Sequence, residues 1–326
     1  MTELSADKIW DLSDKELLNL LDTGKLVRPR RKIKFYAPSF AYHKSRHNCS
    51  MQRFPTISVT GNQCALECKH CGGKVLETML PASTPTKLFK IAENLRRDGT
   101  IGCLVSGGCL PNGSVPLERF IPVLGKIKRE LGLTIVVHTG IVNTGTAEAL
   151  KKAKVDSVLV DVIGSNDTIR EVCNLHVTVD DYEESLKALS SAGLNFVPHI
   201  TVGLHNGLLR GEFQALRMIG RYEPSALVII AFMPLRGTQM ENVKPPSPED
   251  IARVVTAARL RFPETPLALG CMRPKGRHRA ATDVLALQAG VDALAFPSEE
   301  AIRYAKAQGL EDEFSPYCCS QIYVDI

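Results

Sequence analysis

From about residue 55 onward, short β-branched runs alternate with segments that carry apolar residues at helical spacing. Eight of these runs predict strands, at 56–60, 101–106, 134–138, 157–162, 195–202, 226–232, 266–270 and 293–296. The segments between them contain helix start and stop signals, such as Thr84-Pro85, Ser298-Glu299 and Gly309. Repeated strand–helix units are typical of α/β proteins with a parallel sheet.

Eight units favour a complete or nearly complete (β/α)8 TIM-type barrel, and an open barrel of six units is the alternative. A doubly wound sheet is disfavoured because no G-x-G-x-x-G turn follows the first strand. Upstream, the apolar pattern predicts one amphipathic helix over 6–21. We therefore predict an N-terminal helix with a basic connector at 1–54, the barrel at 55–310, and a tail at 311–326 that closes over the barrel mouth.

The chain has 326 residues, of which 44% are hydrophobic and 23% charged, values typical of a globular protein. No apolar run is long enough to cross a bilayer, and the N-terminus lacks a secretory pattern, so we expect a cytoplasmic protein without a membrane partner. Ten cysteines then indicate metal or redox chemistry. The net charge of +5 comes partly from a basic cluster at 25–34, which would contact an acidic protein or, less favoured, nucleic acid, or form a solvated arm.

Cys64, Cys68 and Cys71 follow the first predicted strand in a C-x3-C-x2-C run. Three thiolates at this spacing can hold three irons of a 4Fe–4S cluster and leave the fourth iron open to a small molecule. A structural zinc site is the main alternative, with His70, or His47 and Cys49, completing the ligand set; a disulfide pair and buried thiols are the others. Zinc usually takes two close ligand pairs, and the sequence offers only one. A ferredoxin-type cluster needs a fourth nearby cysteine, and none follows in the next thirty residues.

This run resembles the signature of the radical S-adenosylmethionine (SAM) superfamily. The resemblance implies an open iron that binds the amino and carboxylate groups of SAM, and a cluster electron that cleaves SAM to a 5′-deoxyadenosyl radical. It also implies three further SAM contacts. These are a glycine-rich turn at Ser106, Gly107 and Gly108, a ribose contact at Asp161, and an adenine contact along the strand that contains Ile200 and Val202.

The chain departs from the superfamily pattern at two positions. His70 replaces the usual aromatic residue before the last cysteine, and Cys109 replaces the acidic residue often found after the glycines. The turn itself, rather than a side chain after it, is therefore expected to meet SAM through free backbone N–H groups.

The remaining cysteines offer a second ligand set. In a closed barrel, Cys49, Cys271, Cys318 and Cys319 could converge on the mouth and hold an auxiliary 4Fe–4S cluster. The adjacent pair near the C-terminus could instead form a strained, reducible disulfide. Arg273, at a strand end, could pair with a carboxylate, touch a cluster sulfide or bridge loops.

The layout resembles the biotin synthase and lipoyl synthase branch of the superfamily, and the segments 58–73, 269–276, 290–299 and 313–320 resemble two-component lipoyl synthases. The chain lacks the C-x4-C-x5-C run of single-subunit lipoyl synthases. It also has His138 and His199 where biotin synthases place cysteines at the ends of strands three and five. The resemblance implies insertion of sulfur at an unactivated carbon of a protein-bound octanoyl chain, with the auxiliary cluster as sulfur source.

The implied partners are an octanoylated lipoyl-carrier protein or peptide, a paralogous radical SAM subunit for the second insertion, and an electron donor such as ferredoxin or flavodoxin. Two alternatives stay open. One is a radical SAM enzyme of the same branch with another substrate, in cofactor maturation, on tRNA or in biotin-synthase-like chemistry. The other is a non-catalytic iron–sulfur or zinc protein.

Overall fold

The computed structural model describes residues 5–24, 26, 32–37 and 54–325. Their core is one sheet of eleven strands in the order β11-β1-β10-β9-β8-β7-β6-β5-β4-β2-β3, and every neighbouring pair in it is parallel. The strands are β1 (Lys32–Tyr36), β2 (Thr56–Ser58), β3 (Leu80–Pro81), β4 (Gly102–Ser106), β5 (Thr134–His138), β6 (Ser157–Asp161), β7 (Phe196–Val202), β8 (Leu227–Ala231), β9 (Leu267–Leu269), β10 (Ala293–Ala295) and β11 (Glu311–Ser315).

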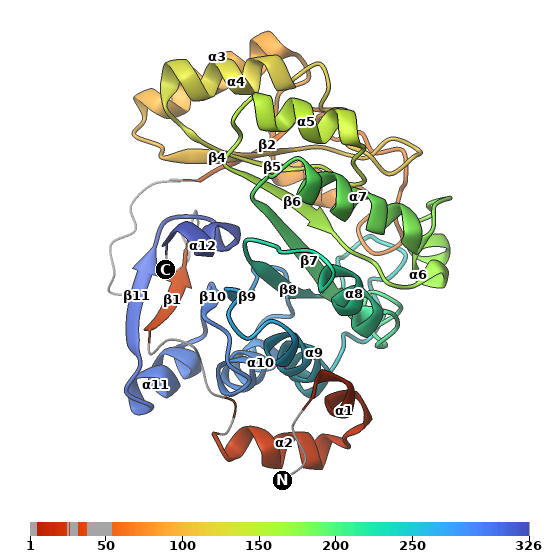
Figure 1. The fold of residues 1–326 in the computed structure, drawn as a ribbon, viewed down its shortest axis with the longest axis vertical. Coiled ribbons are helices and arrows are strands. Elements are labelled where there is room, and N and C mark those ends of the chain that lie inside the picture. Colours follow the sequence, from red (N-terminus) through yellow and green to blue (C-terminus); the bar gives the residue numbers. More distant parts are fainter. Residues whose placement is uncertain (1–4, 25, 27–31, 38–53, 326) are drawn as a thin grey trace.

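Most helices cover the outer, convex side of this curled sheet (Figure 1). In chain order they are α1 (Ala6–Asp11), α2 (Asp14–Asp22), the 3-10 helix η1 (Lys74–Thr78), α3 (Pro85–Arg97), α4 (Ile121–Leu131), α5 (Thr144–Lys152), α6 (Asn166–Glu171), α7 (Val179–Ser191), α8 (Glu212–Ile219), α9 (Pro248–Arg261), α10 (Arg277–Gln288), α11 (Glu299–Ala307), the 3-10 helix η2 (Cys319–Gln321) and α12 (Ile322–Asp325). Of these, η2 and α12 lie within the curve of the sheet (Figure 1). No helix among the described residues is both long and apolar enough to span a membrane.

The predicted α/β class and TIM-type arrangement are confirmed, and each of the eight predicted strands is present with its ends shifted by at most a few residues. Three further strands extend the sheet at its two ends. β1 lies between β10 and β11 (Figure 1). At the other end, β3 pairs with β2. Within the described residues no pairing joins β11 to β3, so the barrel is open rather than fully closed.

Alternation along the strands divides the buried side chains between two faces. Ile135 and Val158 point outward into the large core shared with the helices. Val136 and Leu159 point inward, into a smaller cluster on the concave side. Residues at the carboxyl ends of the strands with the inward parity therefore line the barrel mouth.

The single helix predicted over 6–21 is wrong, because the segment forms two helices, α1 and α2. The chain breaks before Ser13, whose hydroxyl accepts from the Glu16 N–H while the Glu16 carboxylate accepts from the Ser13 N–H at 2.8 Å. This capping box starts a new helix. The buried Arg253 of α9 holds the break in place by donating to the Ile9 carbonyl at 2.9 Å and pairing with Asp14 at 2.7 Å.

The C-terminal tail lies inside the curled sheet (Figure 1). Cys319 and Ile322 pack against inward residues of the strands, and the Tyr323 hydroxyl donates to the Asp156 carbonyl at 2.7 Å, just before β6 begins. The tail therefore extends from the mouth through the interior rather than only covering the opening.

The basic cluster predicted at 25–34 falls mostly outside the described residues. Lys34 is described, and it is buried in an ion pair with Glu313 at 2.9 Å and with Asp325 at 3.6 Å. Its ammonium group thus binds the sheet edge and the tail, and it is not available to a docking partner.

Candidate functional site

The three cysteines of the C-x3-C-x2-C run lie in the loop that leaves β2. Tight turns shape this loop, with the Gly72 N–H donating to the Cys68 carbonyl at 2.7 Å and the Lys74 N–H to the Cys71 carbonyl at 2.8 Å. The ligand atoms of Cys68, His70 and Cys71 all lie within 4.8 Å of one another, and Cys64 is near enough to raise the pKa of Cys68. The loop thus brings the ligand atoms of Cys68, His70 and Cys71 together, with Cys64 nearby.

The thiols of Cys68 and Cys71 are protonated at neutral pH in the absence of a metal. A hydrogen bond with the Cys173 side chain is the main cause that raises the pKa of Cys68, and the Cys68 thiol also donates to the Cys173 carbonyl at 3.3 Å. The contact with Cys68, followed by burial, raises the pKa of Cys71 to about 12. A metal centre at this place must therefore displace protons as it binds.

The glycine turn after β4 packs directly against the cysteine loop. A Cβ atom at Gly108 would lie 2.0 Å from the Gln63 carbonyl oxygen and 2.6 Å from the Cα of Cys64. The Gly108 N–H donates to the Thr60 hydroxyl at 2.7 Å. The prediction of free N–H groups is therefore wrong for Gly108, because this turn uses its backbone to support the cysteine loop.

Cys109 lies near the same group of thiols. No role for its side chain was predicted from the sequence. Its carbonyl accepts from the Ala65 N–H at 2.9 Å, which ties the turn to the loop. Burial, together with the nearby Cys64, Asp161 and Cys71, raises the pKa of Cys109 to about 12. Its place directly after the glycine turn was the available sequence signal.

Polar side chains at the ends of β5, β6 and β7 face the mouth. His138 Nε2 lies 3.5 Å from a carboxylate oxygen of Asp161 without a hydrogen bond, and the rings of His138 and His199 are 5.7 Å apart between centroids. Burial, and then the neighbouring His138, lowers the pKa of His199 to about 4, so this imidazole is neutral at physiological pH. Asp161 is half-exposed, as a ligand-binding carboxylate at this position requires. Ser106 ends β4 beside them and donates to the His138 carbonyl at 3.1 Å.

The side chains of Ile200 and Val202 do not reach the mouth. Both are buried in the core between the sheet and the helices. The expectation that they offer an apolar surface to adenine is wrong for their side chains, because β7 places the alternate residues, His199 and Thr201, on the inner face. Only their backbone could meet a ligand.

A second group of thiols lies across the mouth. Cys271 follows β9 and is an exposed residue. Burial of its thiol group is the main cause that raises its pKa, and the nearby Cys318 raises it further. Hydrogen bonds from Cys319 and from the Ser320 hydroxyl, the latter at 3.2 Å, lower the pKa of Cys318. Three of the four predicted auxiliary ligands, Cys271, Cys318 and Cys319, therefore lie close enough to influence one another's ionisation, and their role as ligands stays a prediction. The fourth, Cys49, lies outside the described residues.

Arg273 bridges loops beside this second group. It is fully buried and pairs with the equally buried Asp283 at 2.7 Å. It also donates to the Gly270 carbonyl at 2.6 Å and to the Phe296 carbonyl at 3.3 Å. Of the roles predicted for it, pairing with a carboxylate and bridging the loops after β9 and β10 match these contacts.

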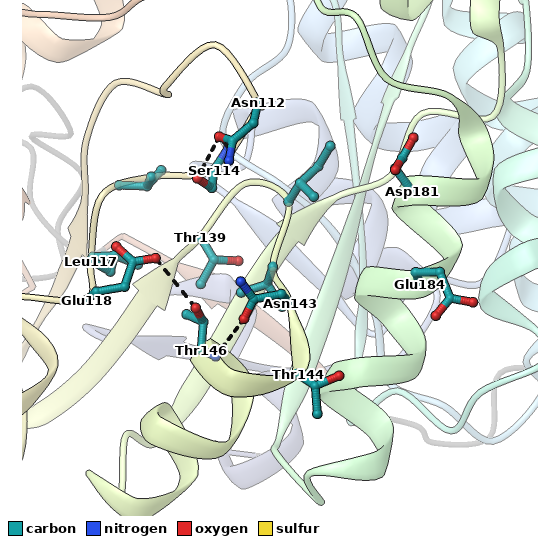
Figure 2. A pocket seen from close by; sticks show the side chains of 13 residues that line it. Asn112, Ser114, Leu117, Glu118, Thr139, Asn143, Thr144, Thr146, Asp181 and Glu184 are labelled. Atoms are coloured by element: carbon teal, nitrogen blue, oxygen red, sulfur yellow. Dashed lines mark hydrogen bonds between the residues drawn. The ribbon is translucent and has the colours of Figure 1, made fainter.

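A polar cavity of about 320 Å³ lies between the loop after β4 and the loop after β5 (Figure 2). Figure 2 shows Glu118 facing Thr146, 3.5 Å apart, and Asn143 capping the start of α5. Asp181 and Glu184 of α7 line the opposite wall. The sequence gave no signal for this cavity, because it depends on how three loops pack.

Comparison with known families identifies the domain built around the first thiol group. The family model described as the radical SAM superfamily matches residues 58–208, which include the cysteine loop and the polar ends of β4 to β7. Over these residues the chain matches the radical SAM superfamily. The thiols of Cys64, Cys68 and Cys71 lie beside a glycine turn and are of the kind that binds an iron–sulfur cluster, and His70 and Cys109 lie close to them.

Curated proteins that are similar to this chain include biotin synthases at low identity. The biotin synthase of Leptospira biflexa is 23% identical over 221 residues, which are 66% of this chain and 62% of that protein. That of Campylobacter hominis is 24% identical over 275 residues, covering 82% of this chain and 78% of that protein. The chain thus spans less than two thirds of the length of the Leptospira biflexa relative.

Two solved structures show the same fold. Methylornithine synthase, PylB, aligns with a TM-score of 0.60 at 16% identity and covers 98% of this chain and 99% of its own. HydG, a maturase of the FeFe-hydrogenase, aligns with a TM-score of 0.62 at 14% identity and covers 97% of this chain and 79% of its own. At these identities the likeness concerns the fold alone.

Proposed function

We propose that this protein is a sulfur-inserting radical SAM enzyme, one subunit of a two-component lipoyl synthase that acts on a protein-bound octanoyl chain. The observation that carries the proposal is the presence of two separate thiol groups at one edge of the sheet. Cys64, Cys68 and Cys71 form the first, and Cys271, Cys318 and Cys319 form the second.

Cys64, Cys68 and Cys71 would hold the catalytic 4Fe–4S cluster, which, when bound, supplies the electron that cleaves SAM to a 5′-deoxyadenosyl radical. An unactivated C–H bond offers no acidic proton, so hydrogen abstraction by such a radical is the chemistry that fits this substrate. The chain's own residues orient and enclose the reactants. Asp161 presents a carboxylate for hydroxyl groups, with His138 and the neutral imidazole of His199 beside it.

The second thiol group would hold the iron–sulfur cluster that serves as the sulfur substrate. The carbon radical forms one C–S bond with a sulfide of that cluster, and the electron released by bond formation reduces one of its irons. Cys271, Cys318 and Cys319 then need to release the damaged cluster, and the exposure of Cys271 would allow this. Partners remain as proposed from the sequence: an octanoylated carrier domain, a paralogous subunit and a reduced ferredoxin or flavodoxin.

A second candidate function is a radical SAM reaction of the same branch on another substrate. It is favoured by the relatives, which are named biotin synthases, and by their low identity to this chain. The two candidates share the first cluster and differ in the molecule that receives the radical.

The test uses the full chain, reconstituted anaerobically with iron and sulfide and assayed with an octanoyl-lysine peptide. Replacing Cys64, Cys68 and Cys71 together with alanine should abolish deoxyadenosine formation while a second cluster signal persists. Replacing Cys318 and Cys319 together with alanine should leave deoxyadenosine formation intact and abolish the thiolated peptide product. Thiolated product at the wild-type yield in the second variant would contradict the proposal. Deoxyadenosine formation by the wild type with no thiolated peptide would favour the second candidate.

A further inference from the structure

The loop between β9 and α10 carries an unusual surplus of positive charge beside the second thiol group. This loop and the first turn of α10 together contain Arg273, Lys275, Arg277 and Arg279 within seven residues, with no acidic residue among those seven. Arg273 is neutralised by Asp283, since the two form an ion pair that is fully buried. The other cation of this group that is partly buried is Arg279, and its charge also needs a neutralising partner.

Arg279 is half-buried, and within the described part of the chain no carboxylate forms an ion pair with it. Its Nη2 donates to the carbonyls of Arg273 at 3.0 Å and of Cys271 at 3.3 Å. Its Nε is buried and has no hydrogen-bond partner. A buried N–H donor on a charged group is costly to leave unpaired, so this arrangement indicates an absent anionic partner.

The local backbone adds to the positive potential. Arg279 lies in the first turn of α10, a helix of twelve residues whose first turn contains no acidic side chain. The positive end of the helix dipole therefore points toward the same place as the guanidinium. A cation in this position is unfavourable unless an anion lies opposite it.

The thiols beside Arg279 become that anion when they bind iron. Arg279 bonds to the backbone of Cys271, and Cys318 is close enough to Cys271 to influence its ionisation. Thiols that are still protonated lose their protons to solvent on ligation, without any redox step, and an iron–sulfur cluster with its thiolates carries net negative charge. Loading the site therefore places an anionic centre beside Arg279.

We infer that Arg279 is a positioning residue for an anionic iron–sulfur centre at Cys271, Cys318 and Cys319, to which its free Nε–H donates a hydrogen bond. This inference rests on the auxiliary centre of the proposed function and adds the residue that compensates its charge. Hydrogen bonds and charge around a cluster set its stability and its reduction potential. Arg279 should therefore slow iron loss from this centre and make its reduction easier.

The experiment isolates the second centre in the full chain by replacing Cys64, Cys68 and Cys71 with alanine. In that background we compare Arg279→Gln and Arg279→Lys with Arg277→Gln, which changes an exposed arginine two residues earlier on the same helix. Iron release to a chelator and the reduction potential are measured after reconstitution, and circular dichroism checks that each variant is folded.

Arg279→Gln should release iron about tenfold faster and show a more negative potential, a size of effect seen for residues that hydrogen-bond to metal ligands. Arg279→Lys, which keeps the cation, should lie between Arg279→Gln and the parent, and Arg277→Gln should match the parent. Equal cluster retention in the Arg279→Gln variant and its parent would overturn this inference and leave the proposed function standing. Unchanged cluster properties with weaker binding of the octanoyl peptide would assign Arg279 to the substrate and overturn it as well. If the background variant takes up no cluster, the auxiliary centre of the proposed function fails, and the inference fails with it.

Discussion

The Glu212 side chain is 4% exposed, accepts a hydrogen bond from the Gly203 N–H at 2.8 Å, and leaves its second carboxylate oxygen without a partner. Burial raises its pKa from 4.5 to about 7, although backbone N–H groups such as that of Gly203 act in the opposite direction. This is the one carboxyl group for which a raised pKa is resolved in the described part of the chain, and it holds the turn that follows β7.

Because the folded-state pKa lies above the unfolded one, the folded protein binds the extra proton between about pH 4.5 and about pH 7. The contribution of Glu212 to the free energy of unfolding is therefore highest below that window and falls as the pH rises through it. Glu212→Gln should remove this fall and stabilise the protein at pH 8 by up to about 3 kcal/mol. Urea unfolding at pH 5 and pH 8 measures it, with Glu264→Gln, at an exposed position, as control. An equal pH response in wild type and Glu212→Gln would refute this account.

Gly108 is limited by space rather than by backbone conformation. A methyl group there would overlap the Gln63 carbonyl and the backbone of Cys64, so Gly108→Ala should displace the cysteine loop. We expect the variant to fold but to retain clearly less iron after reconstitution than the wild type. Gly145→Ala is the control, since its Cβ would meet only the Asn143 side-chain oxygen at 3.5 Å. Normal iron content in Gly108→Ala would show that the loop can adapt.

Single residues can be predicted from the sequence where chemistry rather than orientation decides. The cysteine spacing predicts Cys64, Cys68 and Cys71 as cluster ligands without any structural information. Ile200 and Val202 were placed wrongly because a strand at the barrel wall has two buried faces, and hydrophobicity alone does not say which one is inward. The polar His199 and Thr201 at alternate positions carried the missing signal.

Whole strands and helices followed from the sequence when their pattern was long and periodic. β3 has only two residues, and β11 is mostly polar, so neither gives a strand pattern. β1 lies in a basic segment that composition assigns to a connector, and it becomes a strand through pairing on both sides with β10 and β11. The break between α1 and α2 was visible in advance, because Ser13 and Glu16 have the spacing of a capping box.

The tail helix α12 stabilises the fold from inside the sheet. Ile322 is fully buried among the inward residues, whereas Val324, two positions later, is 64% exposed. Ile322→Ala should lower the free energy of unfolding by about 2–5 kcal/mol, as expected for a large-to-small change in a core, and Val324→Ala should change it little. Urea unfolding of the two variants compares them directly. Equal, small effects would mean that the tail does not pack inside the sheet in solution.

The topology explains why chemistry from distant parts of the chain meets at one edge. In a parallel sheet all carboxyl strand ends lie on the same side, so the loops after β2, β4, β6 and β9 are neighbours there. The sequence alone therefore sufficed to predict that these loops meet at one barrel mouth. The path of the tail could not be predicted, because it depends on the interior volume left by small inward residues such as Ala268, Ala293 and Ala295.

This arrangement leads to a prediction about the origin of the inserted sulfur. If the thiols of Cys271, Cys318 and Cys319 hold a cluster that is consumed, the protein carries its own sulfur and no free sulfide needs to enter the mouth. Protein reconstituted with sulfur-34 sulfide, freed of excess sulfide and mixed with octanoyl peptide, SAM and reductant should yield peptide thiol that carries the label. The yield should stop at no more than one thiol per protein molecule, while deoxyadenosine formation continues, because the first cluster survives each cycle. Mass spectrometry of the peptide measures both label and yield. Unlabelled thiol in the presence of added natural-abundance sulfide, or yields well beyond the protein concentration without resupply, would show that the sulfur comes from solution and not from the thiol-bound centre.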